Sequence, residues 1–300
     1  MNNNVQIKKV ESKVDWGHTF PSDLEIEKSS GLFAFRLIKI TTAFILDKRS
    51  LLKEESFKTR NIEKLLVATF NKENPVALRL DEKIDQLKQA ILNRYLREFA
   101  IVFYKSPNEE EIIEVYTFRL VYTAEGDVSL TLDTGLGSQQ QNQNLLGAKF
   151  ESLEQTKAQF ISTMKKLHRC MKGLDDLPGD ADASFRIAFT DNAPEDYMPN
   201  GFDESDQFYK LDAITNMDLG TMCGGHHKIQ VLAASHLVKL GRAAVDLNQT
   251  SVSMNQSILN TPTTKKRVSE GPKKRLSSNR SRPYGQTGAM TTVRRKPNQT

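Results

Sequence analysis

The sequence predicts an α+β domain with antiparallel strands, followed by a disordered basic tail. Several stretches carry apolar residues at helical spacing, and one stretch alternates its residues between two faces, as a half-buried antiparallel strand does. The last fifty residues are poor in apolar groups and rich in Ser, Thr, Asn, Gln, Pro and Arg. Such a segment cannot bury enough surface to offset its chain entropy, so it should be disordered.

Four stretches predict helices. In the first, Phe33, Leu37, Ile40 and Phe44 follow one another near helical spacing, and the serine pair at 29–30 suits a helix start. The last is strongly amphipathic, with its apolar residues on one side. The four predicted helices cover residues 32–46, 62–70, 81–95 and 153–174.

Five stretches predict strands, and residues 111–123 carry the clearest pattern. This stretch places Tyr116, Phe118, Leu120 and Tyr122 on one face, which we expect to be core. A turn at 124–127 should lead into a further short strand at 128–132, and then into a Gly- and Gln-rich loop at 135–147. The remaining predicted strands are residues 98–104, 184–190 and 228–234.

Residues 192–225 form an irregular stretch with several prolines, glycines and acids. More than about 30 residues without periodicity is far longer than an ordinary connection. Such a stretch is either disordered or functional, and periodicity alone does not choose between these two.

The positive charge of the chain lies in its tail. Residues 249–300 hold eleven bases and one acid, so the remaining 248 residues hold 31 bases and 36 acids of the 42 and 37 in the chain. Two basic clusters predict nuclear import signals, and the alternative is non-specific contact with nucleic-acid phosphates; both can hold. The clusters are Lys265, Lys266, Arg267 and Lys273, Lys274, Arg275.

Several protein classes are excluded. Two cysteines are too few for a disulfide framework, and no secretory signal or membrane-spanning run of about 18 to 20 apolar residues is visible. We therefore expect a soluble protein of a reducing, intracellular compartment. No catalytic or nucleotide-binding motif occurs, so an enzyme and a cofactor are not expected. Cys223, His226 and His227 supply only three of the four ligands that a structural zinc site needs, so no metal is expected.

Several local strings, in this order, resemble the HORMA-domain family. They are the passage 91–104 (ILNRYLREFAIVFY), the string 113–122 (IEVYTFRLVY), the helix end at 167–174 and the string 196–202 (DYMPNGF). The resemblance covers residues 31–240, about two-thirds of the chain. It points to the meiotic chromosome-axis branch, and the chain looks like the small nematode-type members.

The resemblance implies a mainly antiparallel sheet backed by three helices, with a C-terminal segment called the safety belt at about 197–232. A belt of this kind closes over a partner's short peptide, the closure motif, which adds a strand to the sheet. The peptide-binding residues that the resemblance implies are Tyr197, Pro199, Gly201, Phe202, Lys228, Ile229, Gln230, Val231 and Leu232.

By the same resemblance, the tail should carry a closure motif of its own at 279–293, the tail's only segment with an aromatic residue. Its core would be Arg282, Pro283, Tyr284, Gly285, Gln286 and Thr287. The implied domains are an N-terminal segment (1–27), a HORMA domain (28–248) and the tail (249–300).

The implied function is assembly of the meiotic chromosome axis in the nucleus, in support of homologue pairing, synapsis and crossover control. The implied partners are closure-motif peptides of related axis proteins, the protein's own tail in self-association, and an AAA+ remodelling ATPase. Two alternatives stay open. One is a spindle-checkpoint or polymerase-bridging HORMA adaptor, and the other is a chromatin-binding protein that acts through its basic tail.

Overall fold

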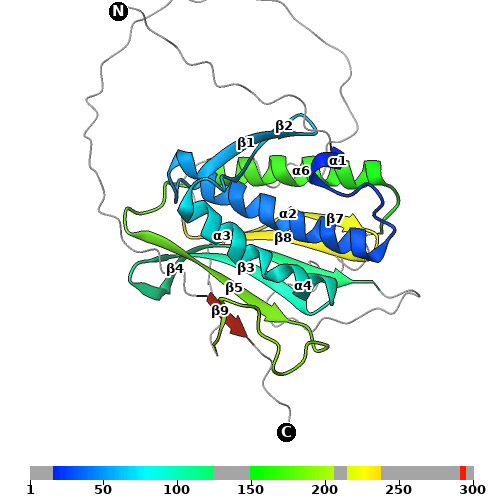
Figure 1. Cartoon of the computed structure of the whole chain (residues 1–300). Helices are drawn as coiled ribbons and strands as arrows, with labels where there is room; N and C mark the ends of the chain where they lie inside the picture. Colours follow the sequence, from blue (N-terminus) through cyan, green and yellow to red (C-terminus); the bar gives the residue numbers. More distant parts are fainter. Residues whose placement is uncertain (1–15, 124–148, 206–214, 238–290, 295–300) are drawn as a thin grey trace, which may run out of the picture. The chain divides into compact units, whose positions relative to one another are not determined.

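A computed structural model of the chain describes residues 16–123, 149–205, 215–237 and 291–294. Helices lie over one face of a seven-stranded sheet, and a separate two-stranded hairpin lies beside them (Figure 1). The α+β class predicted from the sequence is confirmed. The predicted turn, strand and loop within 124–147 lie outside the described residues.

The long helix α2 (Glu27–Lys48) is the centre of the core. Most of its residues are buried, including Phe33, Leu37 and Ile45. Its length and hydropathy would also suit a membrane span, but 78% of its apolar window is buried inside the protein, as expected of a core helix. The other helices are α1 (Trp16–Thr19), η1 (Glu54–Ser56), α3 (Pro75–Asp85), α4 (Leu87–Leu92) and α6 (Leu153–Lys172).

The sheet has the strand order β6-β9-β5-β3-β4-β8-β7. Its main strands pair antiparallel, and β9 pairs parallel with both of its neighbours. Tyr116 and Phe118 on β4 are fully buried, so the predicted core face is confirmed. The strands are β3 (Leu96–Lys105), β4 (Asn108–Tyr122), β5 (Ala181–Phe189), β6 (Asp203–Glu204), β7 (Thr215–Gly224), β8 (His227–Ser235) and β9 (Thr291–Arg294).

The helix predicted at 62–70 is wrong, because this stretch belongs to a β-hairpin. Strands β1 (Phe57–Ile62) and β2 (Leu65–Phe70) pair antiparallel and are joined by Glu63 and Lys64. Both turn residues have positive φ, 47° and 66°, which is the geometry of a tight two-residue hairpin turn. A short apolar run does not distinguish a strand from a helix by periodicity.

The start of α2 also differs from the prediction. The helix begins at Glu27 after Ile26, whose side chain makes no capping hydrogen bond. Ser30 lies inside the helix, and its hydroxyl accepts a hydrogen bond from the backbone N–H of His227 at 3.0 Å. The serine therefore joins α2 to β8 instead of capping the helix.

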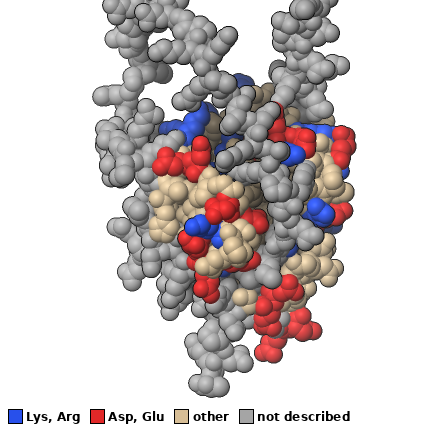
Figure 2. Space-filling view, turned by 90° about the vertical axis from the view of Figure 1, so that its left-hand side faces the viewer, with Lys and Arg blue, Asp and Glu red and all other residues tan. Residues whose placement is uncertain are grey.

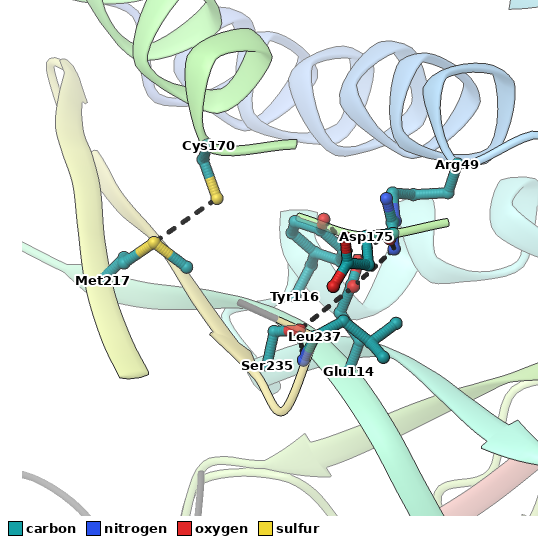
Figure 3. Close-up of polar contacts among 8 residues, drawn as sticks. All are labelled: Arg49, Glu114, Tyr116, Cys170, Asp175, Met217, Ser235 and Leu237. Atoms are coloured by element: carbon teal, nitrogen blue, oxygen red, sulfur yellow. Dashed lines mark hydrogen bonds and ion pairs between the residues drawn. The ribbon is translucent and has the colours of Figure 1, made fainter. Parts of the chain in front are cut away.

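A buried polar cluster fixes the far end of β8 (Figure 3). Arg49, just after α2, forms an ion pair with Glu114 of β4, and Glu114 also accepts hydrogen bonds from Tyr116 and Ser235. The guanidinium also donates to the backbone carbonyl of Asp175, which follows α6. Burial raises the pKa of Glu114, and the nearby guanidinium and hydrogen bonds oppose that rise. The cluster links α2, β4, β8 and the end of α6.

The segment before α2 is docked on the core. Trp16, Phe20 and Leu24 are almost completely buried, and Trp16 packs against Phe33 of α2 and Phe160 of α6. The end of this segment lies against the turn between β7 and β8. Nε2 of the His226 ring donates a hydrogen bond to the Glu25 carbonyl oxygen at 2.9 Å.

Candidate functional site: a strand held at the sheet edge

The most unusual part of the sheet is the short strand β9, because it comes from the basic tail (Figure 1). It runs parallel to β5, with Phe185 opposite Thr291 and Ala188 opposite Arg294. On its other side it runs parallel to β6, with Asp203 opposite Thr292. β9 belongs to the same compact unit as the domain. A segment about 100 residues away in sequence therefore occupies a place between β5 and β6.

The belt segment (190–205) connects β5 to β6 and so borders this place. It leaves β5 through Thr190, whose backbone N–H donates to the Tyr95 carbonyl at 2.7 Å and whose hydroxyl donates to the Arg94 carbonyl at 2.8 Å. Turns with backbone hydrogen bonds follow, from Ala193 to Thr190 and from Tyr197 to Pro194. These bonds give the irregular sequence a defined path.

Tyr197 anchors the middle of the belt segment. Its ring packs edge-on against Tyr95, with the centroids 5.0 Å apart, and against Phe189 at the end of β5, with the centroids 5.5 Å apart. Aromatic pairs of this geometry contribute about 0.5–1.5 kcal/mol beyond their buried area. Partial burial also raises the pKa of the Tyr197 hydroxyl, and the nearby Tyr95 adds to the rise.

Phe202 anchors the end of the belt segment. Its side chain is buried, and the ammonium group of Lys83 on α3 lies 5.6 Å from its ring centroid. Gly201, just before it, has φ of 78°, a conformation that costs other residues energy. A turn in which the Phe202 backbone N–H donates to the Pro199 carbonyl leads the chain into β6. Two aromatic anchors therefore hold the belt segment at either side of its Pro-Asn-Gly turn.

The belt segment is strongly acidic. It contains Asp191, Glu195, Asp196, Asp203 and Glu204, and it contains no lysine or arginine. All five acidic side chains are exposed. More generally, on the side of the protein that lies to the left in Figure 1, acidic groups of the described residues are more prominent than basic ones (Figure 2). The strand that lies beside this segment ends in Arg294 and is followed in sequence by Arg295 and Lys296.

The structure divides the predicted peptide-binding residues into two groups. Tyr197, Pro199, Gly201 and Phe202 lie in the belt segment beside β9. The second group, Lys228, Ile229, Gln230, Val231 and Leu232, lies in β8, which pairs with β4 and β7. Strands β4, β3 and β5 separate β8 from β9, so the two groups are not brought together.

The predicted closure motif at 279–293 overlaps β9 only at its last three residues. Its core, Arg282 to Thr287, lies outside the described residues, as do the import clusters at 265–267 and 273–275. The predicted motif is centred on an aromatic residue, Tyr284, whereas the strand at 291–294 has none. The β-branched pair Thr292 and Val293 was a weaker signal, but one that favours a strand.

The Cys223, His226 and His227 group is taken up by structural contacts. The Cys223 backbone N–H donates a hydrogen bond to the Gln159 side chain, and its carbonyl accepts one from the Thr156 hydroxyl, both on α6. The His227 ring is hydrogen-bonded to the Ser30 hydroxyl. Burial lowers the pKa of His227 to about 4 and raises the pKa of the Cys223 thiol to about 11. Within the described residues, no group of three His, Cys, Asp or Glu side chains is placed to hold a metal ion.

Comparison with known proteins identifies the fold. The family model described as HORMA domain matches residues 30–227. The structure of C. elegans HTP-2 bound to the HIM-3 closure motif is 26% identical, with a TM-score of 0.69 over 76% of this chain and 99% of that one. HTP-1 of C. elegans, bound to the same motif, is 24% identical, with a TM-score of 0.70 over 76% and 99%.

A more distant likeness shows the fold alone. A chain of the mitotic checkpoint complex is 14% identical, with a TM-score of 0.53 over 69% of this chain and 99% of that one. The comparison with curated proteins found no significant match.

Proposed function

Because the chain belongs to the HORMA-domain family, we propose that it is a non-enzymatic adaptor of the meiotic chromosome axis, which holds extended peptides between β5 and its belt segment. One observation carries the proposal: an extended segment from a distant part of the chain is paired on both sides at this place. Backbone pairing on two sides supplies affinity for a strand without requiring a particular sequence.

The likeness to the HTP-2 and HTP-1 domains supports the meiotic branch, since both are structures with a closure motif bound. In this proposal the peptides come from related axis proteins, and the protein's own tail is a further occupant. A domain that holds one peptide and offers another can join copies head to tail into chains. Such an assembly on nuclear chromosome axes would support homologue pairing, synapsis and crossover control, with an AAA+ ATPase to release the peptides.

Disulfide cross-linking in the full chain tests directly whether a strand is held between β5 and β6. Asp203 on β6 and Thr292 on β9 are register partners, so Asp203→Cys combined with Thr292→Cys should form a bridge under mild oxidation. The matched control moves the second cysteine by eight residues, to Thr300→Cys. An excess of free peptide with the sequence of residues 287–298 should slow bridging, because it competes for the same place.

Bridging within one molecule indicates that the tail of the same chain is held, and bridging between two molecules indicates the tail of another copy. Either result supports the adaptor. Equal bridging in the paired and control variants, with no effect of the free peptide, contradicts it. Location along paired chromosomes, and not at kinetochores, separates the axis role from a checkpoint role.

A further inference from the structure

We propose that the belt segment selects its occupants by charge. The preferred occupant is a strand of about four uncharged, proline-free residues that is followed directly by a run of lysines or arginines. The inference rests on the proposed function, since it concerns the same place between β5 and β6. It adds the chemical class of the peptides that fit there.

The pairing register sets the direction in which the occupant leaves the sheet. Arg294 is opposite Ala188, one residue before the end of β5. Beyond that point β5 continues into the belt segment, where the first acid is Asp191. The end of β9 that carries Arg294 therefore lies at the end of β5 that leads into the acidic segment.

Acids also lie on the other side of the occupant. Asp203 and Glu204 of β6 are the register partners of Thr292 and Val293, immediately before the basic run. Both of their side chains are exposed, as is that of Asp191. Asp203 already interacts with one cation, Lys83. Burial lowers the pKa of Lys83, and the negative charge of Asp203 opposes that change. The belt segment still carries five acids and no base of its own, so a basic occupant reduces its self-repulsion.

The tail itself provides an independent comparison. It contains three runs of three consecutive basic residues, at 265–267, 273–275 and 294–296. The four residues before the first run include Pro262, and those before the second include Pro272. Proline has no backbone N–H to donate to a neighbouring strand. Only the third run follows four residues without proline. Of those four residues, 291–293 are paired in the sheet.

Hydrogen exchange of the amides at 291–294, measured in the full chain, tests the selection. The belt variant carries Asp191→Asn, Asp203→Asn and Glu204→Gln, and the tail variant carries Arg294→Gln, Arg295→Gln and Lys296→Gln. A single exposed ion pair contributes little to stability, but each variant removes three charges. Each variant should therefore lower the protection of these amides against exchange by about tenfold, equivalent to about 1.4 kcal/mol. The two together should lose little more than either alone, because they remove the same interaction.

Two further measurements make the test specific for charge. A charge-swapped chain, with lysines at the three belt positions and glutamates at the three tail positions, should regain most of the protection. Salt at 1 M, where the Debye length falls to about 3 Å, should lower protection in the original chain and leave the neutral variants almost unchanged. The matched control removes three exposed acids elsewhere, with Glu55→Gln, Glu110→Gln and Glu151→Gln, and should keep full protection.

The outcomes separate this inference from the proposed function. If residues 291–294 exchange freely in the original chain, β9 is not held there, and the observation that carries the proposed function is lost together with this inference. If they are protected but respond neither to the charge variants nor to salt, the place holds a strand and the charge selection is wrong.

Discussion

Arg49 Nη2 donates to Glu114 Oε2 at 2.9 Å, and both side chains are buried. This pair joins the end of the core helix to β4, and through Ser235 it reaches the end of β8. Desolvation of two charges is costly, so the pair is stable only while both partners and their hydrogen bonds are present. The end of β8 therefore depends on one buried guanidinium.

Arg49→Ala should lower the free energy of unfolding by about 3–5 kcal/mol, because it leaves the Glu114 carboxylate buried without its cation. Urea denaturation measures the loss. The matched control is Lys48→Ala, since the neighbouring Lys48 pairs with Asp47 at the surface and should contribute less than about 1 kcal/mol. Equal losses in the two variants would contradict the account.

The stability lost in Arg49→Ala should also depend on pH in a defined direction. Burial already raises the pKa of Glu114, and removal of Arg49 should raise it further. A carboxyl group with a raised pKa holds its proton better in the folded state, so folded stability falls as pH rises above the unfolded pKa of about 4.3. The difference between the original chain and Arg49→Ala should therefore be larger at pH 8 than at pH 5.

Gly225→Ala should be much more damaging than Gly201→Ala. Both glycines have positive φ, 61° and 78°, which costs other residues about 1–2 kcal/mol. A Cβ at Gly225 would also lie 2.1 Å from the Leu24 carbonyl oxygen, whereas a Cβ at Gly201 would meet nothing within 4 Å. Thermal melts should show the larger drop in melting temperature for Gly225→Ala, and tryptophan fluorescence should show that Trp16 becomes exposed. Equal losses would mean that the N-terminal segment does not press against this turn.

His227 should make the fold sensitive to mild acid. Burial lowers its pKa to about 4, below the unfolded value of about 6.5. A histidine with a lowered folded pKa contributes its full share of stability above the unfolded pKa and loses it as pH falls toward the folded pKa. Between pH 7 and pH 5 the free energy of unfolding should fall by about 2 kcal/mol on this account. His227→Asn should remove most of that slope, and an unchanged slope would exclude His227 as its source.

Tyr197→Ala should loosen the belt segment, since it removes the ring that packs on Tyr95 and Phe189. Amide exchange at 291–294 should speed up by about three- to tenfold, in line with the energy of such aromatic pairs. Tyr197→Phe keeps the ring and should leave exchange unchanged. If the phenylalanine variant behaves like the alanine variant, the hydroxyl is the important group and the packing account is wrong.

The long periodic elements could be predicted from the sequence, and the short or bulged ones could not. Residues 111–123 alternate cleanly, and β4 covers almost the same range. β7 was missed because a register shift between Asp218 and Gly220 breaks its alternation. Residues 62–70 of the hairpin resemble a helix in part because the second strand begins with two adjacent apolar residues, Leu65 and Leu66, of which Leu66 is exposed.

The candidate site was only partly predictable, because pairing between distant segments leaves little local signal. The string at 196–202 pointed to Tyr197 and Phe202, but their partners Tyr95, Phe189 and Lys83 come from other elements. An aromatic anchor was sought in the tail, whereas β9 holds its place by backbone pairing, which threonine and valine make as readily as tyrosine does.

The chain contains one tryptophan, Trp16, and its ring is 1% exposed among Phe20, Phe33 and Phe160. Its fluorescence therefore reports on the packing of the N-terminal segment against α2 and α6. A red shift in emission before the loss of far-ultraviolet circular dichroism would mean that this segment lifts off while the sheet is still intact. The protein carries its own optical probe of that step, without any added label.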